Sequence, residues 1–296
     1  MRKILAVIVY MSFALAASAQ ALPSLLIGAD PEAAATGGSS IARAADAYAV
    51  DNNSAAMALS DKEFSVAASY GMWAPNTADN MLAGLGFFYR LNDRMAVGFT
   101  GRMLRDKPYD ITSVTGQVSG SFTPSDLLAG VGFSYAISDG LSLGVSGRFT
   151  SSSIAAGMKG SAIGADITAL YSRDSFSAAA GLCNLGTPVS YGAGTYAQPM
   201  LVKAGAAYSA SGLTASAEVD YLFSGALMAG LGVEYCIADI ASLRAGYHYG
   251  DPAKALASYA SLGLGLEFSG FSLDLAFLTA SETLGNSLLF GIGYSF

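Results

Sequence analysis

One pattern fills most of this sequence and restricts the folds that the chain can adopt. From residue 64 onward, stretches of about ten residues alternate between large apolar side chains and small or polar ones, and each stretch ends at a break. Alternation with period two places the two kinds of side chain on opposite faces of a β-strand. Stretches of about 9–11 residues match the tilted strands of a membrane barrel, whereas strands of soluble proteins are more often about 5–6 residues long.

The pattern predicts an all-β, antiparallel transmembrane β-barrel of about fourteen strands. The breaks after even-numbered strands are short, and those after odd-numbered strands are mostly longer, above all 104–125, 150–160 and 184–198. Short periplasmic turns and longer outer loops are typical of barrels in the outer membrane of Gram-negative bacteria, so we expect both chain ends in the periplasm. We place the strands near residues 64–73, 81–91, 95–103, 127–137, 141–149, 161–172, 176–183, 200–208, 213–223, 227–237, 243–250, 259–268, 271–279 and 287–296.

The charged residues of the predicted strands share one parity. In the last strand, for example, Phe290 and Ile292 alternate with Gly291 and Gly293, so the first pair suits lipid and the second suits a barrel interior. A basic residue that faces lipid at the midplane costs about 2–4 kcal/mol, which explains why charge avoids the lipid parity. We therefore expect the following polar residues to line the lumen: Arg90, Arg102, Arg148, Asp166, Lys203, Glu218, Asp220, Glu234, Arg244, Glu267 and Asp274.

Two interpretations of this charged interior stay open. The side chains form either a polar pore or binding cavity, or a set of ion pairs that fills a closed barrel, and we favour ion pairs because buried charges are normally paired. The inward parity also carries many glycines, which make room for a plug or simply allow the strands to curve. These glycines are Gly84, Gly86, Gly130, Gly132, Gly205, Gly230, Gly232, Gly263 and Gly265.

Composition and the first residues point to export. The chain is 52% hydrophobic but only 12% charged, about half the charge of an ordinary soluble domain, and a disordered chain would need the opposite balance. A formal net charge of −7 without a basic run makes nucleic acid an improbable partner, and outer-membrane lipid the expected one. Residues 1–19 combine Arg2 and Lys3, an apolar run and small residues up to Ala19, which predicts a cleaved signal peptide.

Residues 20–61 precede the strands and do not alternate. They are rich in Ala, Asp, Asn and Ser, with a Gly37-Gly38 pair. A connection of this length without regular structure is uncommon unless it is functional. We therefore predict that residues 20–61 fold inside the barrel as an N-terminal plug, and that residues 62–296 form the outer-membrane barrel.

The predicted plug carries a family resemblance. Residues 27–58 read IGADPEAAATGGSSIARAADAYAVDNNSAAMA, which resembles the opening of PorV/PorQ proteins and their FadL relatives, and Gly37, Gly38, Asp46 and Asn53 match that pattern. Two later stretches are similar to PorV in particular: GQVSGSFTPSD at 116–126, and NLG at 184–186 followed by Tyr191. The resemblance implies a fourteen-stranded barrel with a plug, and a role in type IX secretion in which the barrel carries cargo by its C-terminal signal domain.

The residues that carry chemistry do not converge in the sequence. His248 is the only histidine, and we interpret it as a polar lumen residue near Asp251, because acid–base catalysis needs several convergent partners. Cys183 and Cys236 fall at opposite ends of their strands, whereas a disulfide requires Cα atoms within about 7 Å. We therefore expect two free thiols that face the lumen, no metal site and no cofactor.

Two functions from different classes follow. The first is an interaction protein resembling PorV, an accessory or cargo shuttle of type IX secretion that binds the secretion channel and cargo C-terminal domains through its extracellular loops. The second is a FadL-like channel for the uptake of hydrophobic small molecules. An enzyme is the weakest hypothesis, because His248 lacks a visible partner set.

Overall fold

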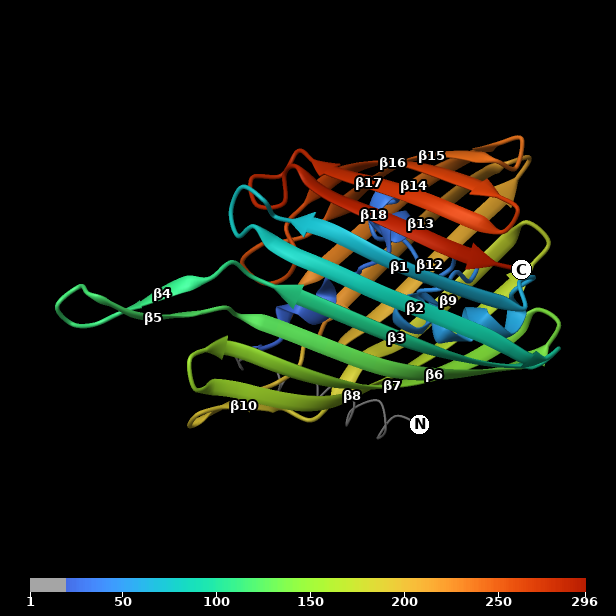
Figure 1. The fold of residues 1–296 in the computed structure, drawn as a ribbon. Helices are drawn as coiled ribbons and strands as arrows, with labels where there is room; N and C mark the ends of the chain where they lie inside the picture. The colour runs from blue at the N-terminus through green and yellow to red at the C-terminus, as the bar shows by residue number, and fades with distance from the viewer. Residues whose placement is uncertain (1–19) are drawn as a thin grey trace.

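The computed structural model describes residues 20–296, so the predicted signal peptide lies outside the described residues. The architecture is a closed antiparallel β-barrel, as predicted (Figure 1). Its fourteen wall strands, in chain order, are β1 (Phe64–Trp73), β2 (Asn80–Asn92), β3 (Met95–Arg105), β6 (Ser125–Ser138), β7 (Leu141–Ala155), β8 (Met158–Arg173), β9 (Phe176–Gly186), β12 (Leu201–Ala210), β13 (Leu213–Leu222), β14 (Leu227–Ile237), β15 (Ala241–Tyr249), β16 (Tyr259–Phe268), β17 (Phe271–Thr279) and β18 (Ser287–Ser295).

The first and last strands close the ring. β1 pairs with β18 from Ser65 opposite Ser295 to Met72 opposite Leu288. The closure continues past the strand end, because the Phe64 amide donates to the Phe296 carbonyl at 3.0 Å. Every wall strand therefore has two neighbours, which is what a β-structure needs in lipid, where water cannot satisfy a free edge.

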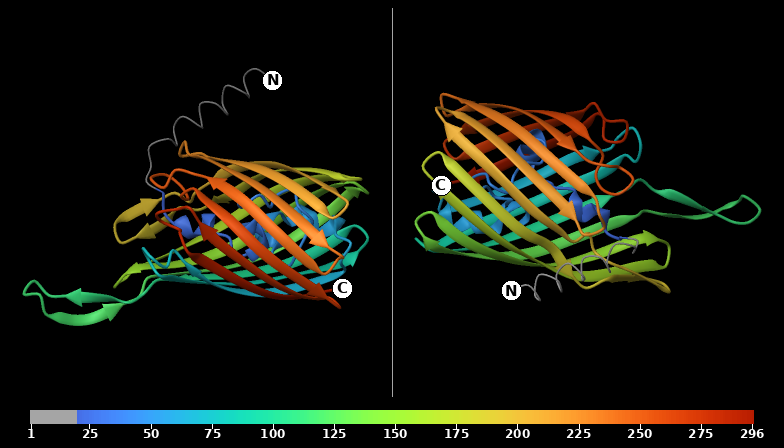
Figure 2. Two further views of the ribbon diagram at one scale, coloured as in Figure 1. Left: turned by 90° about the horizontal axis from the view of Figure 1, so that it is seen from above. Right: turned by 180° about the vertical axis from the view of Figure 1, so that it is seen from behind.

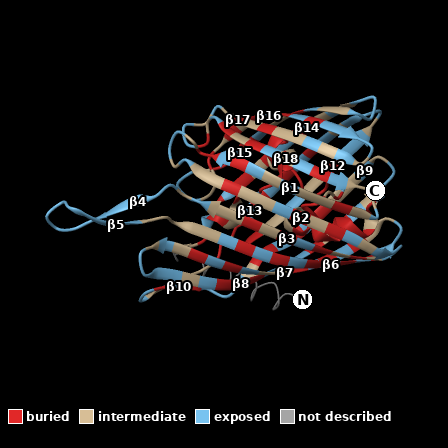
Figure 3. Cartoon of the chain, viewed as in Figure 1, coloured by how far each residue is buried: buried red, intermediate tan, exposed pale blue. Residues whose placement is uncertain are grey.

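The two faces of the wall differ as the period-two pattern predicts (Figure 3). In β13 the outward side chains of Val219 and Tyr221 are about half exposed, while the inward Glu218 and Asp220 are buried. The same alternation of exposed and buried residues runs along β6 and most of β8. The exposed face is thus apolar and the buried face holds the charges, the reverse of a soluble sandwich.

The two ends of the barrel are built differently. At one end, tight turns join neighbouring strands, such as Ser269-Gly270 between β16 and β17, where both residues have positive φ as two-residue hairpin turns require. The opposite end carries the longer connections. Two of them contain small hairpins: β4 (Tyr109–Thr112) with β5 (Val118–Phe122), and β10 (Val189–Tyr191) with β11 (Gly194–Tyr196). The β4–β5 hairpin projects far beyond the wall (Figure 1).

One predicted loop is instead part of the wall. Residues 150–160 were expected to be irregular, but β7 continues to Ala155 and β8 already begins at Met158. Ser151, Ser152 and Ser153 continue the ladder there, with Ser153 opposite Lys159. This stretch lies beyond the apolar band, where both faces of a strand tolerate polar residues, so the alternation that marks a strand is lost.

Residues 20–61, called here the lumen segment, lie inside the ring (Figure 2). They form four short helical elements: η1 (Pro23–Leu26), α2 (Pro31–Ala35), α3 (Ala49–Asn52) and η2 (Ser54–Leu59). Ile41, Val50 and Met57 of this segment pack with the inward Phe88 of β2 in one apolar cluster. No helix of residues 20–296 is long and apolar enough to cross a membrane.

The lumen segment runs through the barrel from one end to the other. It begins at the long-loop end, where the Ala21 amide donates to the Ala197 carbonyl at 3.0 Å, just before β12. It ends at the short-turn end, where the Glu63 amide donates to Phe296 at 2.7 Å. The two ends of the described chain therefore lie at opposite ends of the barrel, whereas the sequence led us to expect both on one side. The expectation missed that the segment crosses the full length of the lumen.

The exposed apolar face predicts a sharp penalty for charge at mid-wall. Leu264 lies midway along β16 and faces outward, 53% exposed. We expect Leu264→Arg to lower the free energy of unfolding in lipid vesicles by about 2–4 kcal/mol, because the guanidinium must enter hydrocarbon. Denaturant titration measures this change. The matched control is Ile111→Arg in the projecting hairpin, which should leave stability within about 0.5 kcal/mol; equal effects of both substitutions would contradict a lipid-facing wall.

Candidate functional site

The Gly37-Gly38 pair of the lumen segment lies directly on the wall. Both residues have positive φ, 67° and 78°, which glycine adopts without strain. A Cβ on Gly37 would lie 2.5 Å from the Tyr247 carbonyl oxygen, and a Cβ on Gly230 of β14 would lie 2.5 Å from the Gly37 carbonyl oxygen. The segment and the wall therefore touch backbone to backbone, and glycine is needed on both sides of this contact.

Most of the glycines predicted to face inward serve the same purpose. A Cβ on each of seven of them would collide with the lumen segment or press tightly against it: Gly84, Gly86, Gly132, Gly205, Gly230, Gly232 and Gly263. The remaining two, Gly130 and Gly265, instead make room for neighbouring wall side chains such as Arg148 and Arg244. Room for the lumen segment, and not strand curvature alone, thus accounts for most of the inward glycines.

Two arginines and three carboxylates fix the segment to β14, β15 and β17. Arg244 of β15 bonds Asp274 at 2.6 Å and Glu32 of the segment at 3.0 Å, and it also contacts Glu234. Arg43 of the segment reaches Glu32 at 2.5 Å and Glu234 at 3.2 Å. Each carboxylate therefore meets an arginine, and Glu32 and Glu234 each meet both.

A second network lies on the other side of the lumen. Arg148 of β7 makes a two-pronged contact with Asp166 of β8, at 2.8 and 2.6 Å. On β3, which β6 separates from β7, Arg102 lies 3.6 Å from Asp51 of the lumen segment. Asp51 also accepts the Thr100 hydroxyl proton at 2.9 Å. This network, like the first, joins a wall arginine to a carboxylate of the segment.

The NLG stretch at 184–186 completes this second network. Asn184 has a positive φ of 59° and interrupts the β8–β9 register between Ala165 and Ile167. Its side-chain oxygen accepts from Arg148 at 2.6 Å, and its amide nitrogen donates to the Pro199 carbonyl at 2.9 Å. The asparagine therefore holds an irregular point of the wall together from the inside.

A third network links β12 and β13 to the segment. Lys203 of β12 contacts Glu218 at 2.8 Å and Asp220 at 3.6 Å. The second oxygen of Glu218 accepts the backbone amides of Ser40 and Ile41, at 2.8 and 2.7 Å. A wall carboxylate thus caps backbone donors that the segment would otherwise bury without partners.

The other predicted motif residues hold the segment's own turns. Asp46 accepts the Tyr48 amide at 2.8 Å. Asn53 accepts the Ala55 amide at the start of η2 and donates to the Ile41 carbonyl at 2.6 Å. The four motif residues Gly37, Gly38, Asp46 and Asn53 therefore act on the shape of the segment. Of the predicted lumen residues, Arg90 and Glu267 lie near the short-turn end and join none of the three networks among residues 20–296.

His248 and the cysteines do not form a reactive cluster. His248 is buried, its Nδ1 lies 3.2 Å from the Gly37 carbonyl, and its ring stacks on Tyr259 at 5.0 Å between centroids. Its position thus supports the Gly37-Gly38 contact. Cys183 and Cys236 are free thiols on the inward parity, as expected. Within residues 20–296, no cluster of His, Cys, Asp and Glu has the geometry of a metal site.

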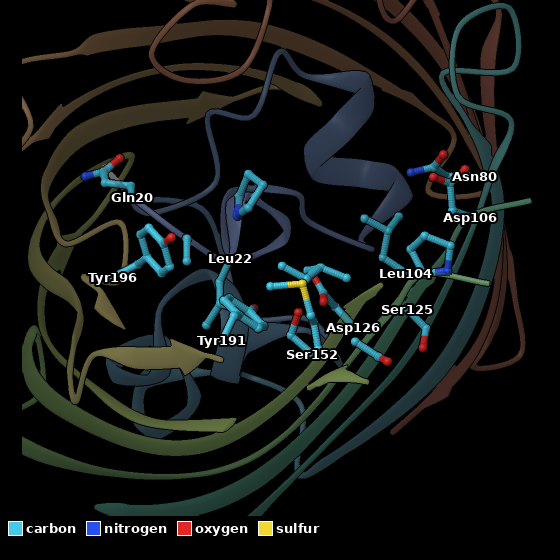
Figure 4. Close-up of a pocket in the computed structure, with 16 residues that line it drawn as sticks. Gln20, Leu22, Asn80, Leu104, Asp106, Ser125, Asp126, Ser152, Tyr191 and Tyr196 are labelled. Atoms are coloured by element: carbon cyan, nitrogen blue, oxygen red, sulfur yellow. The ribbon is translucent and has the colours of Figure 1, made fainter. Parts of the chain in front are cut away.

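A cavity of about 360 Å³ opens at the long-loop end, which we call the mouth. The start of the lumen segment forms one side of it, the ends of β3, β6 and β7 form another, and Tyr191 and Tyr196 of the β10–β11 hairpin contribute aromatic rings (Figure 4). Asp126, from the start of β6, accepts a hydrogen bond from Ser24 of the segment. The cavity therefore joins parts of the chain that lie far apart in sequence.

A comparison with protein-family models shows to which family this chain belongs. The family model of the type IX secretion system protein PorV matches residues 15–190, more than half of the sequence. The chain belongs to the PorV family. Among curated proteins, none matches it. The family thus agrees with the resemblance noted in the lumen segment, at 116–126 and at 184–186, all of which lie within the matched residues.

Solved structures place this PorV-family chain among outer-membrane channels by fold. The toluene transporter TodX of Pseudomonas putida superposes with a TM-score of 0.70 at 15% identity, covering 91% of this chain and 98% of that chain. The toluene transporter TbuX of Ralstonia pickettii gives 0.66 at 13%, covering 91% and 98%, and a Pseudomonas aeruginosa FadL homologue gives 0.57 at 14%, covering 91% and 96%. At these identities the likeness concerns the fold alone.

Sequence reasoning missed the partners that the segment supplies in this PorV-family barrel. Glu32, Arg43 and Asp51 pair with wall charges, but none of them was predicted as a site residue. The available signal was their isolation, since each is a charged residue in a stretch of small residues. Such residues in a buried segment require partners of opposite charge.

The backbone contact at Gly230 predicts a strong effect of a single methyl group. We expect Gly230→Ala to destabilise the barrel by about 1–3 kcal/mol, because the lumen segment must move away from β14. The matched control is Gly147→Ala on β7, where an added Cβ meets nothing within 4 Å. That control should be neutral or slightly stabilising. Denaturant unfolding in lipid compares the two, and limited proteolysis reports release of the segment.

The charged network around Arg244 predicts an equally specific loss. We expect Arg244→Met to cost about 3–5 kcal/mol, because it leaves Glu32, Glu234 and Asp274 partly unpaired in a buried site. Arg173→Met removes an exposed ion pair with Asp174, at 3.8 Å, and should change stability by less than about 1 kcal/mol. A similar unfolding midpoint for both variants would show that the lumen network does not hold the segment.

Proposed function

We propose that this PorV-family barrel is an accessory or cargo-shuttle component of type IX protein secretion. In this proposal the long-loop end faces the outside of the cell and binds cargo C-terminal domains or the secretion channel. The family match over residues 15–190 supports this class of function. The observation that carries the proposal is the β4–β5 hairpin, which extends from the mouth away from the wall (Figure 1).

The hairpin presents apolar side chains without covering them. Tyr109 and Ile111 lie on one face of β4, opposite Phe122 and Gly120 of β5, and they are 45% and 38% exposed. The other face carries Asp110 opposite Ser121. An isolated two-stranded hairpin is marginally stable in water. A partner that covers the apolar face would therefore stabilise the hairpin, and burial of this face would also stabilise the complex.

The two edges of the hairpin also differ. β4 contains Asp110 and follows Lys107 and Pro108, and charge and proline are residues that natural proteins use to block edge pairing. β5 (Val118–Phe122) contains neither charge nor proline. Its backbone donors and acceptors are therefore open to a partner strand, which fits a role in holding another β-structure.

The filled lumen favours an interaction role over an open pore. Three ionic networks and seven glycine contacts fix the lumen segment to the wall along most of the ring. Passage of a hydrated solute would require the segment to leave these contacts. We also propose that the chain has no catalytic role, because His248 is buried, with its Nδ1 against the Gly37 carbonyl and its ring stacked on Tyr259.

Removal of the hairpin tests the proposal directly. Replacing residues 107–123 by a short Gly-Ser turn should abolish co-purification of cargo C-terminal domains and of the secretion channel from membranes. The wall should be unaffected, because Arg105 and Ser125 pair with each other below the cut, and heat-modifiable migration on gels checks this. Unchanged recovery of both partners from a folded variant would refute a docking role for the hairpin.

A matched pair of point variants tests which face is used. Ile111→Lys places a charge on the apolar face, and Ser121→Lys places the same charge on the polar face of the same hairpin, opposite Asp110. We expect the first to reduce partner recovery at least tenfold and the second to change it less than twofold. Quantitative pull-down with purified cargo domain measures both; a larger effect of Ser121→Lys would move the interface to the other face.

The mouth cavity favours a second candidate, a FadL-like channel for hydrophobic small molecules. Its volume of about 360 Å³ and its mostly apolar lining are of the size and character of small-molecule sites, and the barrel shares its fold with toluene transporters. In this case cells that express the barrel should take up a small aromatic hydrocarbon faster than cells without it. Uptake that persists without the barrel would argue against this function.

A further inference from the structure

The charges around the mouth cavity are of one sign. Of the 16 residues that line it, the charged ones are Asp106 and Asp126, and none is Lys, Arg or His. Figure 4 shows Asp126 beside Ser152, with Tyr191 next to them and Leu22 of the lumen segment packed near Tyr191. A cavity for a fatty-acid anion would need a cation at its rim, because a second carboxylate near Asp126 would be repelled.

Asp126 retains capacity to bind a donor. Within residues 20–296 its carboxylate accepts one hydrogen bond, from the Ser24 hydroxyl, whereas an ionised carboxylate offers about four acceptor positions. Asp106, by comparison, already accepts the Lys107 amide at 2.9 Å and the Tyr109 hydroxyl at 2.7 Å. Asp126 therefore keeps more free acceptor positions than Asp106 and is the carboxylate better able to take a hydrogen-bond donor from a ligand.

The aromatic rings favour the same kind of ligand. Tyr191 and Tyr196 both line the cavity, with ring centroids 6.2 Å apart. Burial raises the pKa of the Tyr191 hydroxyl, and the nearby charge of Asp126 adds to the rise, so the ring stays neutral at physiological pH. Neutral tyrosine faces attract cations, and a carboxylate binds an ammonium group through charge-assisted hydrogen bonds.

The rest of the lining suits an apolar body. Leu22, Leu104, Ile154 and Met158 surround the cavity together with two prolines. We propose that the mouth cavity binds a small amphiphilic amine, with its ammonium group on Asp126 near the tyrosines and its hydrocarbon part against these apolar side chains. The proposal deepens the second candidate function by naming a ligand class. Only transport of the amine through the barrel rests on that function, since binding at the mouth does not require transport.

A series of ligands with one chain length tests the charge preference. Octylammonium, octanol and octanoate would be titrated calorimetrically into the purified barrel in phosphatidylcholine nanodiscs, with empty nanodiscs as the blank. We expect octylammonium to bind at least tenfold more tightly than octanoate, with octanol between them. Equal binding, preference for octanoate, or no binding of octylammonium above the blank would overturn the proposal.

Two variants locate the site. Asp126→Asn keeps an acceptor for Ser24 but removes the charge, and should bring octylammonium to within twofold of octanol. Asp110→Asn, which removes a carboxylate of the hairpin that does not line the cavity, should leave the preference unchanged. If Asp126→Asn does not fold, Leu104→Trp fills the cavity instead and should abolish binding of all three ligands. An unchanged preference in either cavity variant would place binding elsewhere, and uptake measured in parallel separates failure of binding from failure of transport.

Discussion

The structure depends on the requirement that charge inside a lipid-embedded wall be neutralised within the lumen. The outward face cannot carry charge because hydrocarbon surrounds it, so Arg102, Arg148, Lys203 and Arg244 all point inward. Wall carboxylates neutralise part of this charge, and Glu32 and Asp51 of the lumen segment contribute to the rest. The wall and the segment are therefore not independent units, because each leaves buried charges without partners when the other is absent.

Close packing imposes a second condition on the same interior. A ring of this size has little room for a segment of 42 residues if both the inner face of the wall and the segment carry large side chains. The sequence places glycine on the wall and alanine on the segment at their contacts. Ala29 lies on Gly84, Ala35 on Gly263 and Ala47 on Gly86. Glycine weakens a strand relative to alanine, yet the ring tolerates it because every strand is paired on both sides.

The parts of the fold that the sequence predicted are those on which lipid acts. Hydrocarbon forces apolar residues onto every second position, so the wall strands, their order and the inward charges follow from parity. Outside the apolar band this constraint ends, and Ser151 to Ser153 of β7, the β4–β5 hairpin and the β10–β11 hairpin were not recognised as strands. The lumen segment has no period at all, so the pairing of Glu32 with Arg244, which are 212 residues apart, left no local signal. The sequence also carried no signal for the direction in which the lumen segment runs through the barrel.

The mouth brings the two candidate functions into contact through Asp106. This residue lines the cavity, and its carboxylate also accepts the hydroxyl of Tyr109, which belongs to the apolar face of the hairpin. The far side of the cavity is Leu22 and Pro23, from which the lumen segment continues to Glu32 and its ionic network. A ligand that fits only this arrangement stabilises the hairpin base and the start of the segment together. A partner that moves Tyr109 would change the affinity of the cavity for its small-molecule ligand. By thermodynamic linkage, the ligand would then change the affinity of the hairpin for that partner by the same factor. Under the two proposed functions, binding of cargo and binding of a small molecule would therefore be coupled where both displace Asp106, and independent where the partner leaves it in place.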